Sequence, residues 1–242
     1  MRSTPPAALL GLSLALLGAA ASAATCQAVS GPSVPTVVEL YTSEGCSSCP
    51  PADHWLSSLK DRDDVIALAY HVDYWDSASW RDRFAQPAFS QRQDASRRTT
   101  GARFSYTPQV VVDGKDAPDR PFPELGSVHG KASTPVSLKL VRGADDVELT
   151  VSTGSSGTPA KGFVAVVDDG LTSHVKGGEN RGATLHHDAV VREYVSWSAA
   201  ESSQTLRVTP TTAPEPGTSR HWVAVAVDDL GKPVQAVSLR CR

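Results

Sequence analysis

The sequence predicts an α/β domain in its N-terminal half and a smaller all-β domain in its C-terminal half. In the first half, an apolar strand pattern at residues 36–41 is followed by a helical pattern and by a fully apolar run at residues 65–72. This order is typical of parallel strands joined by a right-handed crossover. From about residue 135, short strand patterns separated by Gly, Pro, Ser and Asp predict an antiparallel sheet or sandwich.

Residues 1–24 have the pattern of a cleaved secretory signal peptide. Arg2 precedes an apolar run at residues 7–17, and the segment ends in Ala21-Ser22-Ala23, small residues that signal peptidase accepts. We expect a mature chain that begins near Ala24 and is periplasmic or secreted. The apolar run is short for a membrane span, and no later stretch approaches spanning length. We therefore expect no membrane span after cleavage.

Two cysteines lie where the first strand pattern gives way to a helix at about residues 50–60. Cys46 and Cys49 are three residues apart, and Pro50 and Pro51 suit the first helical turn. A helix N-terminus carries a partial positive charge, which favours ionisation of a nearby thiol. We therefore assign Cys46 as an attacking thiolate and Cys49 as a resolving thiol.

The same pair has two less reactive interpretations. It can be an inert structural disulfide, or half of a metal site. Zinc would need two further ligands, whereas Cu(I) could use the two thiolates with His54 or His71. We expect no bound metal and no organic cofactor.

The rest of the N-terminal half is predicted to hold a helical insertion and a short hairpin. The insertion covers about residues 73–103, with aromatic side chains at helical spacings. Residues 109–112 follow Pro108 as a short strand that ends in the Asp113-Gly114 turn. A Pro-rich linker then closes a domain at residues 25–123, and residues 124–242 form the second domain.

Two segments of the C-terminal half carry polar side chains of interest. His186 and His187 are adjacent in a strand pattern and would point to opposite faces, so we read them as structural. Residues 178–182, Gly-Glu-Asn-Arg-Gly, suit either a flexible turn or a loop laid over a site.

Composition limits the partners and the cysteine pairing. The 242 residues include 23 basic and 26 acidic side chains with no basic stripe, so we expect no nucleic-acid partner. An exported protein keeps few idle thiols, which makes Cys26 and Cys241 a candidate structural disulfide. Because this bridge would close nearly the whole chain, it could contribute up to about 5 kcal/mol.

The Cys-x-x-Cys at a helix start, its two flanking strands, and Thr107-Pro108 before the next strand together resemble the thioredoxin fold. The resemblance implies a cis Pro108 facing the disulfide, with the Thr107 backbone available to pair with a client peptide. It also suggests Glu39 as the buried acid that handles the proton of the resolving thiol. Ser48 stands where thioredoxin has proline, so the direction of electron flow stays open.

Three longer strings, at residues 39–53, 106–114 and 178–182, resemble one particular family. It is a family of exported bacterial thioredoxin-like proteins catalogued as a domain of unknown function. The resemblance covers essentially the whole mature chain, and it implies a fold more than a function.

We expect an exported thiol-disulfide oxidoreductase that acts by mixed-disulfide exchange through Cys46 and Cys49. Its partners would be client proteins that carry thiols or disulfides, and an electron donor or acceptor that the sequence does not identify. The alternatives are a non-catalytic thioredoxin-like binding module of the cell envelope and a Cu(I)-handling protein.

Overall fold

A computed structural model describes residues 26–118, 122–125, 130–131, 135–154 and 160–241. The expected signal peptide at residues 1–24 lies outside the described residues. In the N-terminal half the elements are β1 (Gln27–Val29), β2 (Ser33–Val34), β3 (Thr36–Thr42), α1 (Pro50–Ser57), β4 (Val65–His71), α2 (Pro87–Thr100), β5 (Gln109–Val112), β6 (Lys115–Asp116) and β7 (Gly130–Lys131).

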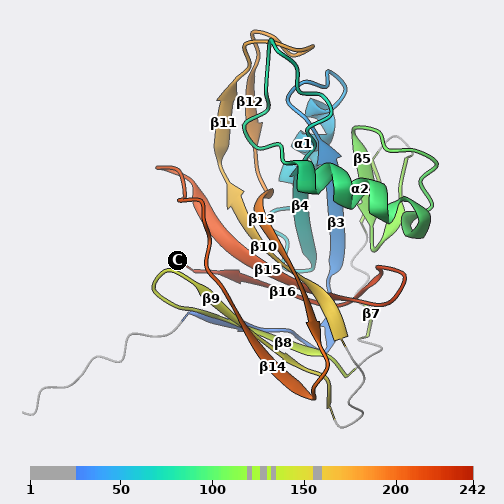
Figure 1. The fold of residues 1–242 in the computed structure, drawn as a ribbon, viewed down its shortest axis with the longest axis vertical. Coiled ribbons are helices and arrows are strands. Elements are labelled where there is room, and N and C mark those ends of the chain that lie inside the picture. Colours follow the sequence, from blue (N-terminus) through green and yellow to red (C-terminus); the bar gives the residue numbers. More distant parts are fainter. Residues whose placement is uncertain (1–25, 119–121, 126–129, 132–134, 155–159, 242) are drawn as a thin grey trace, which may run out of the picture.

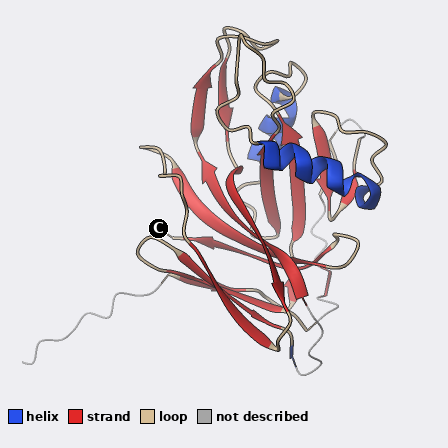
Figure 2. Cartoon of the chain, viewed as in Figure 1, coloured by secondary structure: helices blue, strands red, loops and turns tan. Residues whose placement is uncertain are grey.

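The C-terminal half consists of strands and turns within the described residues (Figures 1 and 2). These strands are β8 (Ser137–Arg142), β9 (Val147–Ser152), β10 (Ala160–Asp169), β11 (Leu171–His174), β12 (Thr184–His187), β13 (Val190–Ala199), β14 (Ser203–Val208), β15 (Ser219–Val227) and β16 (Pro233–Arg240).

The expected α/β thioredoxin-like N-terminal domain is wrong. Strands β3, β4 and β5 belong to one eight-stranded mixed sheet with the order β16-β15-β10-β13-β4-β3-β5-β6, which takes strands from both halves of the chain. The protein is mostly β, with two helices in the described part. The physical reason is a long-range pairing, because β13 lies parallel to β4, where Val190 is the partner of Ala69.

The local prediction around the cysteines is closer to the structure. Strands β3 and β4 pair in parallel from Thr36 with Val65 to Thr42 with His71, with α1 between them in the chain. Every residue of β4 is buried, as its continuous apolar pattern indicates. The helix is shorter than predicted and ends at Ser57.

The expected insertion at residues 73–103 is helical only in its second part. Helix α2 begins at Pro87, whereas residues 73–86 form turns. These turns are held by side-chain carboxylates: Asp76 accepts the amide N–H of Asp82, and Asp82 accepts that of Phe84. Short-range bonds of this kind compete with helix formation. In Figure 1, α2 crosses in front of β3 and β4.

A second sheet, β1-β8-β9-β14, packs against the β10, β15 and β16 part of the large sheet (Figure 1). Leu138, Leu149, Trp197 and Trp222 lie in the core between the two sheets. Cys26 and Cys241 form a disulfide with a Cα–Cα distance of 5.9 Å and a sequence separation of 215.

No helix in the described part of the chain is long and apolar enough to cross a membrane. The structure holds two disulfides, and such bonds are compatible with folding in an oxidising, extracellular compartment.

Candidate functional site

The Cys46–Cys49 disulfide lies between the end of β3 and the first turn of α1. A chain of turn hydrogen bonds fixes this segment. The amide of Cys46 donates to the carbonyl of Ser43, that of Cys49 to the carbonyl of Cys46, and that of Ala52 to the carbonyl of Cys49. Cys49 immediately precedes the helix, so the pair lies at the positive end of the α1 dipole.

Both cysteines are buried. Cys46 is 1% exposed and Cys49 is fully buried, although a reactive pair would be expected to present Cys46 to solvent. The Cys46 sulfur lies 3.5 Å from the hydroxyl oxygen of Ser48. A partner can therefore reach Cys46 only if a covering segment moves.

The loop at residues 178–182, between β11 and β12, lies against the cysteine segment and is hydrogen-bonded to it. The amide and the hydroxyl of Ser47 donate to Glu179 Oε2 at 2.9 and 2.7 Å. The side-chain amide of Asn180 donates to the carbonyl oxygens of Glu44 and Cys46, at 3.0 and 2.9 Å. Of the two interpretations of this loop, the structure shows the one in which it is laid over the cysteines.

Four buried titratable side chains form a cluster that includes Glu44, two residues before Cys46. Nδ1 of His71 lies 2.7 Å from Oδ2 of Asp82, and Nε2 of His187 lies 3.4 Å from Oε1 of Glu44. The His71 and His187 rings are 5.1 Å apart. The two pairs are joined because Asp82 also accepts the amide N–H of Glu44 at 2.8 Å.

Within this cluster, His71 and Asp82 shift each other's pKa. Burial lowers the pKa of His71, but the Asp82 carboxylate outweighs burial and holds that pKa above its ordinary value. Burial raises the pKa of Asp82, but His71 and the amide donors outweigh it and hold that pKa below its usual range. Both shifts favour the charged forms of the His71–Asp82 pair.

Asp53 lies one helical turn after Cys49, and its amide donates to the carbonyl of Cys49. Its Oδ2 accepts a hydrogen bond from the hydroxyl of Thr42, with 3.1 Å between the two oxygen atoms. Burial raises the pKa of Asp53, while His71 and His187 counteract part of that rise. Residues four apart share a helix face, so the Asp53 carboxyl and the Cys49 side chain lie on the same side of α1.

A cavity of about 430 Å³ opens between α1 and β12, next to this cluster. Its lining includes Pro50, Asp53, His54, His186 and His187. His187 is thus buried in the cluster yet borders a cavity, and the adjacent His186, which is exposed, borders the same cavity.

Thr107 and Pro108 are joined by a cis peptide bond. The indole N–H of Trp75 donates to the hydroxyl of Thr107 at 2.7 Å. Trp75 also packs on Gly45, where an added Cβ would lie 3.2 Å from that of Trp75. Trp75 therefore bridges Thr107 and the residue before Cys46.

Glu39 lies elsewhere. Its carboxylate pairs with Arg92 of α2, whose guanidinium stacks over the rings of Tyr70, Phe163 and Tyr194. The structure thus places Glu39 in an ion pair and places Asp53 and Glu44 near the cysteines instead. A sequence signal for Asp53 existed in its spacing of four from Cys49, but Glu44, Asp82 and His187 meet only through tertiary contacts.

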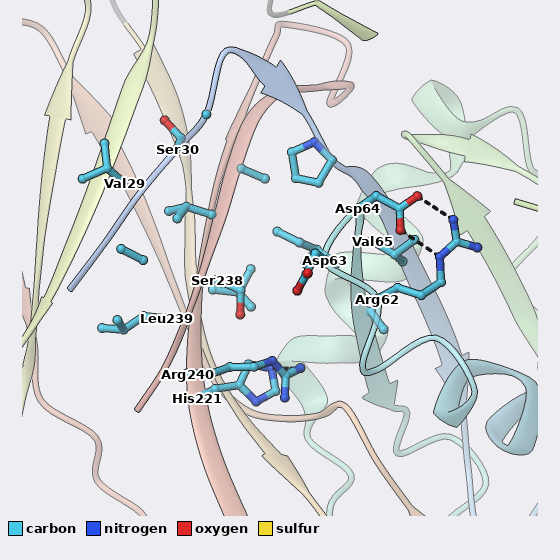
Figure 3. A pocket seen from close by; sticks show the side chains of 18 of the residues that line it. Val29, Ser30, Arg62, Asp63, Asp64, Val65, His221, Ser238, Leu239 and Arg240 are labelled. Atoms are coloured by element: carbon cyan, nitrogen blue, oxygen red, sulfur yellow. Dashed lines mark hydrogen bonds and ion pairs between the residues drawn. The ribbon is translucent and has the colours of Figure 1, made fainter. Parts of the chain in front are cut away.

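Another cavity, of about 510 Å³, lies away from this site, between β1, β16 and the turn before β4 (Figure 3). Arg62, Asp64, His221 and Arg240 line it, and neither redox-candidate cysteine does. Its cations already have partners, since Arg62 pairs with Asp64 and Arg240 with Asp169. We therefore exclude it from the candidate site.

Across the described residues, no group of three or more His, Cys, Asp or Glu side chains has an arrangement that could hold a metal ion. The Cys46–Cys49 pair has neither His54 nor His71 placed with it as a ligand set. The structure thus gives no support to the Cu(I) alternative.

Comparison with known proteins gives a family and a fold. A family model described as "Protein of unknown function (DUF1223)" matches residues 37–228. No curated protein matches the chain. Protein AGR_C_4864 from Agrobacterium tumefaciens is 25% identical, with a TM-score of 0.60 over 86% of this chain and 95% of that one. HBP35 of Porphyromonas gingivalis is 17% identical, with a TM-score of 0.58 over 87% of this chain and 76% of that one, and this likeness shows the fold alone.

Proposed function

We propose that this chain is an exported thiol-disulfide oxidoreductase. It belongs to the DUF1223 family of proteins of unknown function. The observation that carries the proposal is the placement of the Cys46–Cys49 disulfide. The bond spans a single turn at the N-terminus of α1, and Cys46 follows the buried Glu44 by two residues. A thiol at a helix N-terminus is easier to ionise than one in water.

The reaction proceeds by two exchange steps. In the reduced protein, the Cys46 thiolate attacks a client disulfide, which forms a Cys46–client disulfide and releases one client thiolate. Cys49 then loses its proton and attacks the Cys46 sulfur, which closes the Cys46–Cys49 bond and releases the second client thiolate. Two electrons pass to the client, and an external thiol returns the protein to its reduced form. Both steps can also run in reverse.

Asp53 is the group best placed to take the Cys49 proton. It lies on the same side of α1 as Cys49, and burial raises its carboxyl pKa. A carboxyl with a raised pKa is a better proton acceptor than one with an ordinary pKa. In this proposal Asp53 has the role that the sequence suggested for Glu39, while Thr107 and Pro108 remain on the client side of the site.

A periplasmic or secreted location is part of the proposal. It is supported by the signal-like pattern at residues 1–24 and by the two disulfides. An oxidising compartment keeps the Cys26–Cys241 bond closed while Cys46 and Cys49 exchange with clients.

The test is an exchange assay with insulin as the disulfide-bonded substrate and glutathione as the thiol donor. We expect the wild type to accelerate insulin reduction and the Cys46→Ser variant to fall to the rate of glutathione alone. The matched control is Cys26→Ser/Cys241→Ser, which removes the other disulfide and should retain exchange. Equal rates for wild type and Cys46→Ser would contradict the proposal.

The second candidate function is a non-catalytic binding module of the cell envelope. The burial of both sulfurs favours it, because a structural disulfide needs no access to solvent. A module of this kind predicts that glutathione fails to open Cys46–Cys49 in the folded protein.

A further inference from the structure

We propose that residues 44–47 form the docking surface for a client, and that the loop at residues 178–182 occupies this surface in the resting protein. The client segment that replaces the loop carries an acidic residue followed by a carboxamide residue. This inference rests on the proposed exchange function and names the class of partner that the site takes.

The loop uses the peptide groups on both sides of Cys46. The carboxylate of Glu179 accepts hydrogen bonds from the amide and the hydroxyl of Ser47. Asn180 and the amide of Glu179 supply N–H groups to the carbonyl oxygens of Glu44, Gly45 and Cys46. An extended peptide that approaches Cys46 must use these same backbone groups.

The shape of the loop depends on two glycines. Gly178 has a φ of +71°, and a Cβ added there would lie 3.1 Å from the Cα of Gly45. Gly182 has a φ of +88° at the other end of the loop. Both backbone conformations favour glycine, and the close approach at Gly178 lets the loop backbone lie on the cysteine segment.

The loop can be exchanged without loss of core packing. Gly178, Glu179, Arg181 and Gly182 are exposed, and only Asn180 is partly buried. Val175, just before the loop, is buried and anchors the hairpin of β11 and β12 (Figure 1). Displacement of the loop therefore costs hydrogen bonds that an incoming peptide can replace, and little buried apolar surface.

The bonding pattern defines the occupant. The Ser47 donors require an acceptor with two free lone pairs, which a carboxylate supplies best. The three carbonyl oxygens require N–H donors, which a backbone amide and a side-chain carboxamide supply. A Glu-Asn or Asp-Gln segment can therefore make the hydrogen bonds to residues 44–47 that Glu179 and Asn180 make in the resting protein.

The first arm of the test measures how well the loop covers Cys46. The reduced Glu179→Ala/Asn180→Ala protein is treated with iodoacetamide, and the alkylation of Cys46 is followed by mass spectrometry. Loss of two side-chain anchors should raise the alkylation rate by about tenfold or more. Arg181→Ala changes the same loop at a side chain with no hydrogen bond to residues 44–47 in the described structure, and should match the wild type. Thermal melting confirms that all three proteins are folded.

The second arm measures docking without any exchange chemistry. A thiol-free peptide, acetyl-Gly-Glu-Asn-Arg-Gly-amide, is added to the reduced double variant at roughly millimolar concentration. We expect it to slow Cys46 alkylation at least twofold, and a Gly-Ala-Ala-Arg-Gly peptide to leave the rate unchanged. Equal alkylation of the double variant and the wild type, or equal effects of the two peptides, would overturn the inference. Failure of the insulin assay alone would overturn the exchange function and leave this result standing.

Discussion

A Cys49→Ser variant should accumulate a covalent adduct with its client, while a Cys46→Ser variant should form none. In the exchange scheme, Cys46 makes the mixed disulfide and Cys49 resolves it, so removal of the Cys49 sulfur stalls the reaction at the first intermediate. The position of Cys49, fully buried in the protein, means that bulk thiols cannot easily replace it. The adduct is measured on a non-reducing gel after incubation with a periplasmic or secreted protein fraction, followed by mass spectrometry of the linked peptide.

The double variant Cys46→Ser/Cys49→Ser is the matched control, because it keeps the Cys26–Cys241 bond and removes both exchange sulfurs. It should give no adduct. Adducts through Cys26 or Cys241, or equal adduct levels for the two single variants, would show that Cys46 is not the attacking thiol.

Replacement of Asp82 by alanine should lower the free energy of unfolding by about 3–5 kcal/mol, the range for breaking a buried ion pair. The carboxylate accepts three hydrogen bonds, from His71 Nδ1 and from the amides of Glu44 and Phe84. All of these donors would lose their acceptor inside the protein. Urea denaturation at a pH between 3.8 and 6.5 measures the loss.

The pH dependence identifies the cause of that loss. The pKa of Asp82 is held below its ordinary value of 3.8, so its contribution is present above that pH and is lost as pH falls through the folded pKa. The pKa of His71 is raised above 6.5, so its contribution is present below that pH and is lost as pH rises through the folded pKa. The difference between wild type and Asp82→Ala should therefore be largest between pH 3.8 and pH 6.5, where both contributions are present.

Asp94→Ala is the matched control for stability. Asp94 pairs with Arg97 on the surface of α2, where its side chain is 65% exposed. Exposed pairs of this kind contribute less than about 1 kcal/mol. A loss at Asp82 no larger than the loss at Asp94 would show that the buried cluster does not stabilise the fold.

Local patterns predicted the cysteine segment well. The strand before Cys46, the helix that begins at Pro50 and the buried strand at Val65 all follow from hydrophobic period and from proline chemistry within a few residues. The assignment to a family catalogued as a domain of unknown function was also confirmed, because the strings around Cys46, Thr107 and residues 178–182 lie within the matched region.

Long-range pairing was beyond the reach of such patterns. The apolar run of β4 shows that both faces are buried, but it does not show that β13 is a neighbour. The α/β domain was expected for that reason, since a strand–helix–strand unit is the same whether its sheet stops at four strands or extends to eight. Glu44 and His187 are likewise distant in sequence, and their contact depends on where the hairpin of β11 and β12 lies.

The most direct measurement is the selective reduction of the folded protein in a series of dithiothreitol redox buffers, with each cysteine quantified by alkylation and mass spectrometry. The exchange account predicts that Cys46–Cys49 opens at a potential of roughly −120 to −270 mV, typical of redox-active pairs, while Cys26–Cys241 stays closed and the fold is retained. Reduction of both disulfides together, only when the protein unfolds, would contradict it.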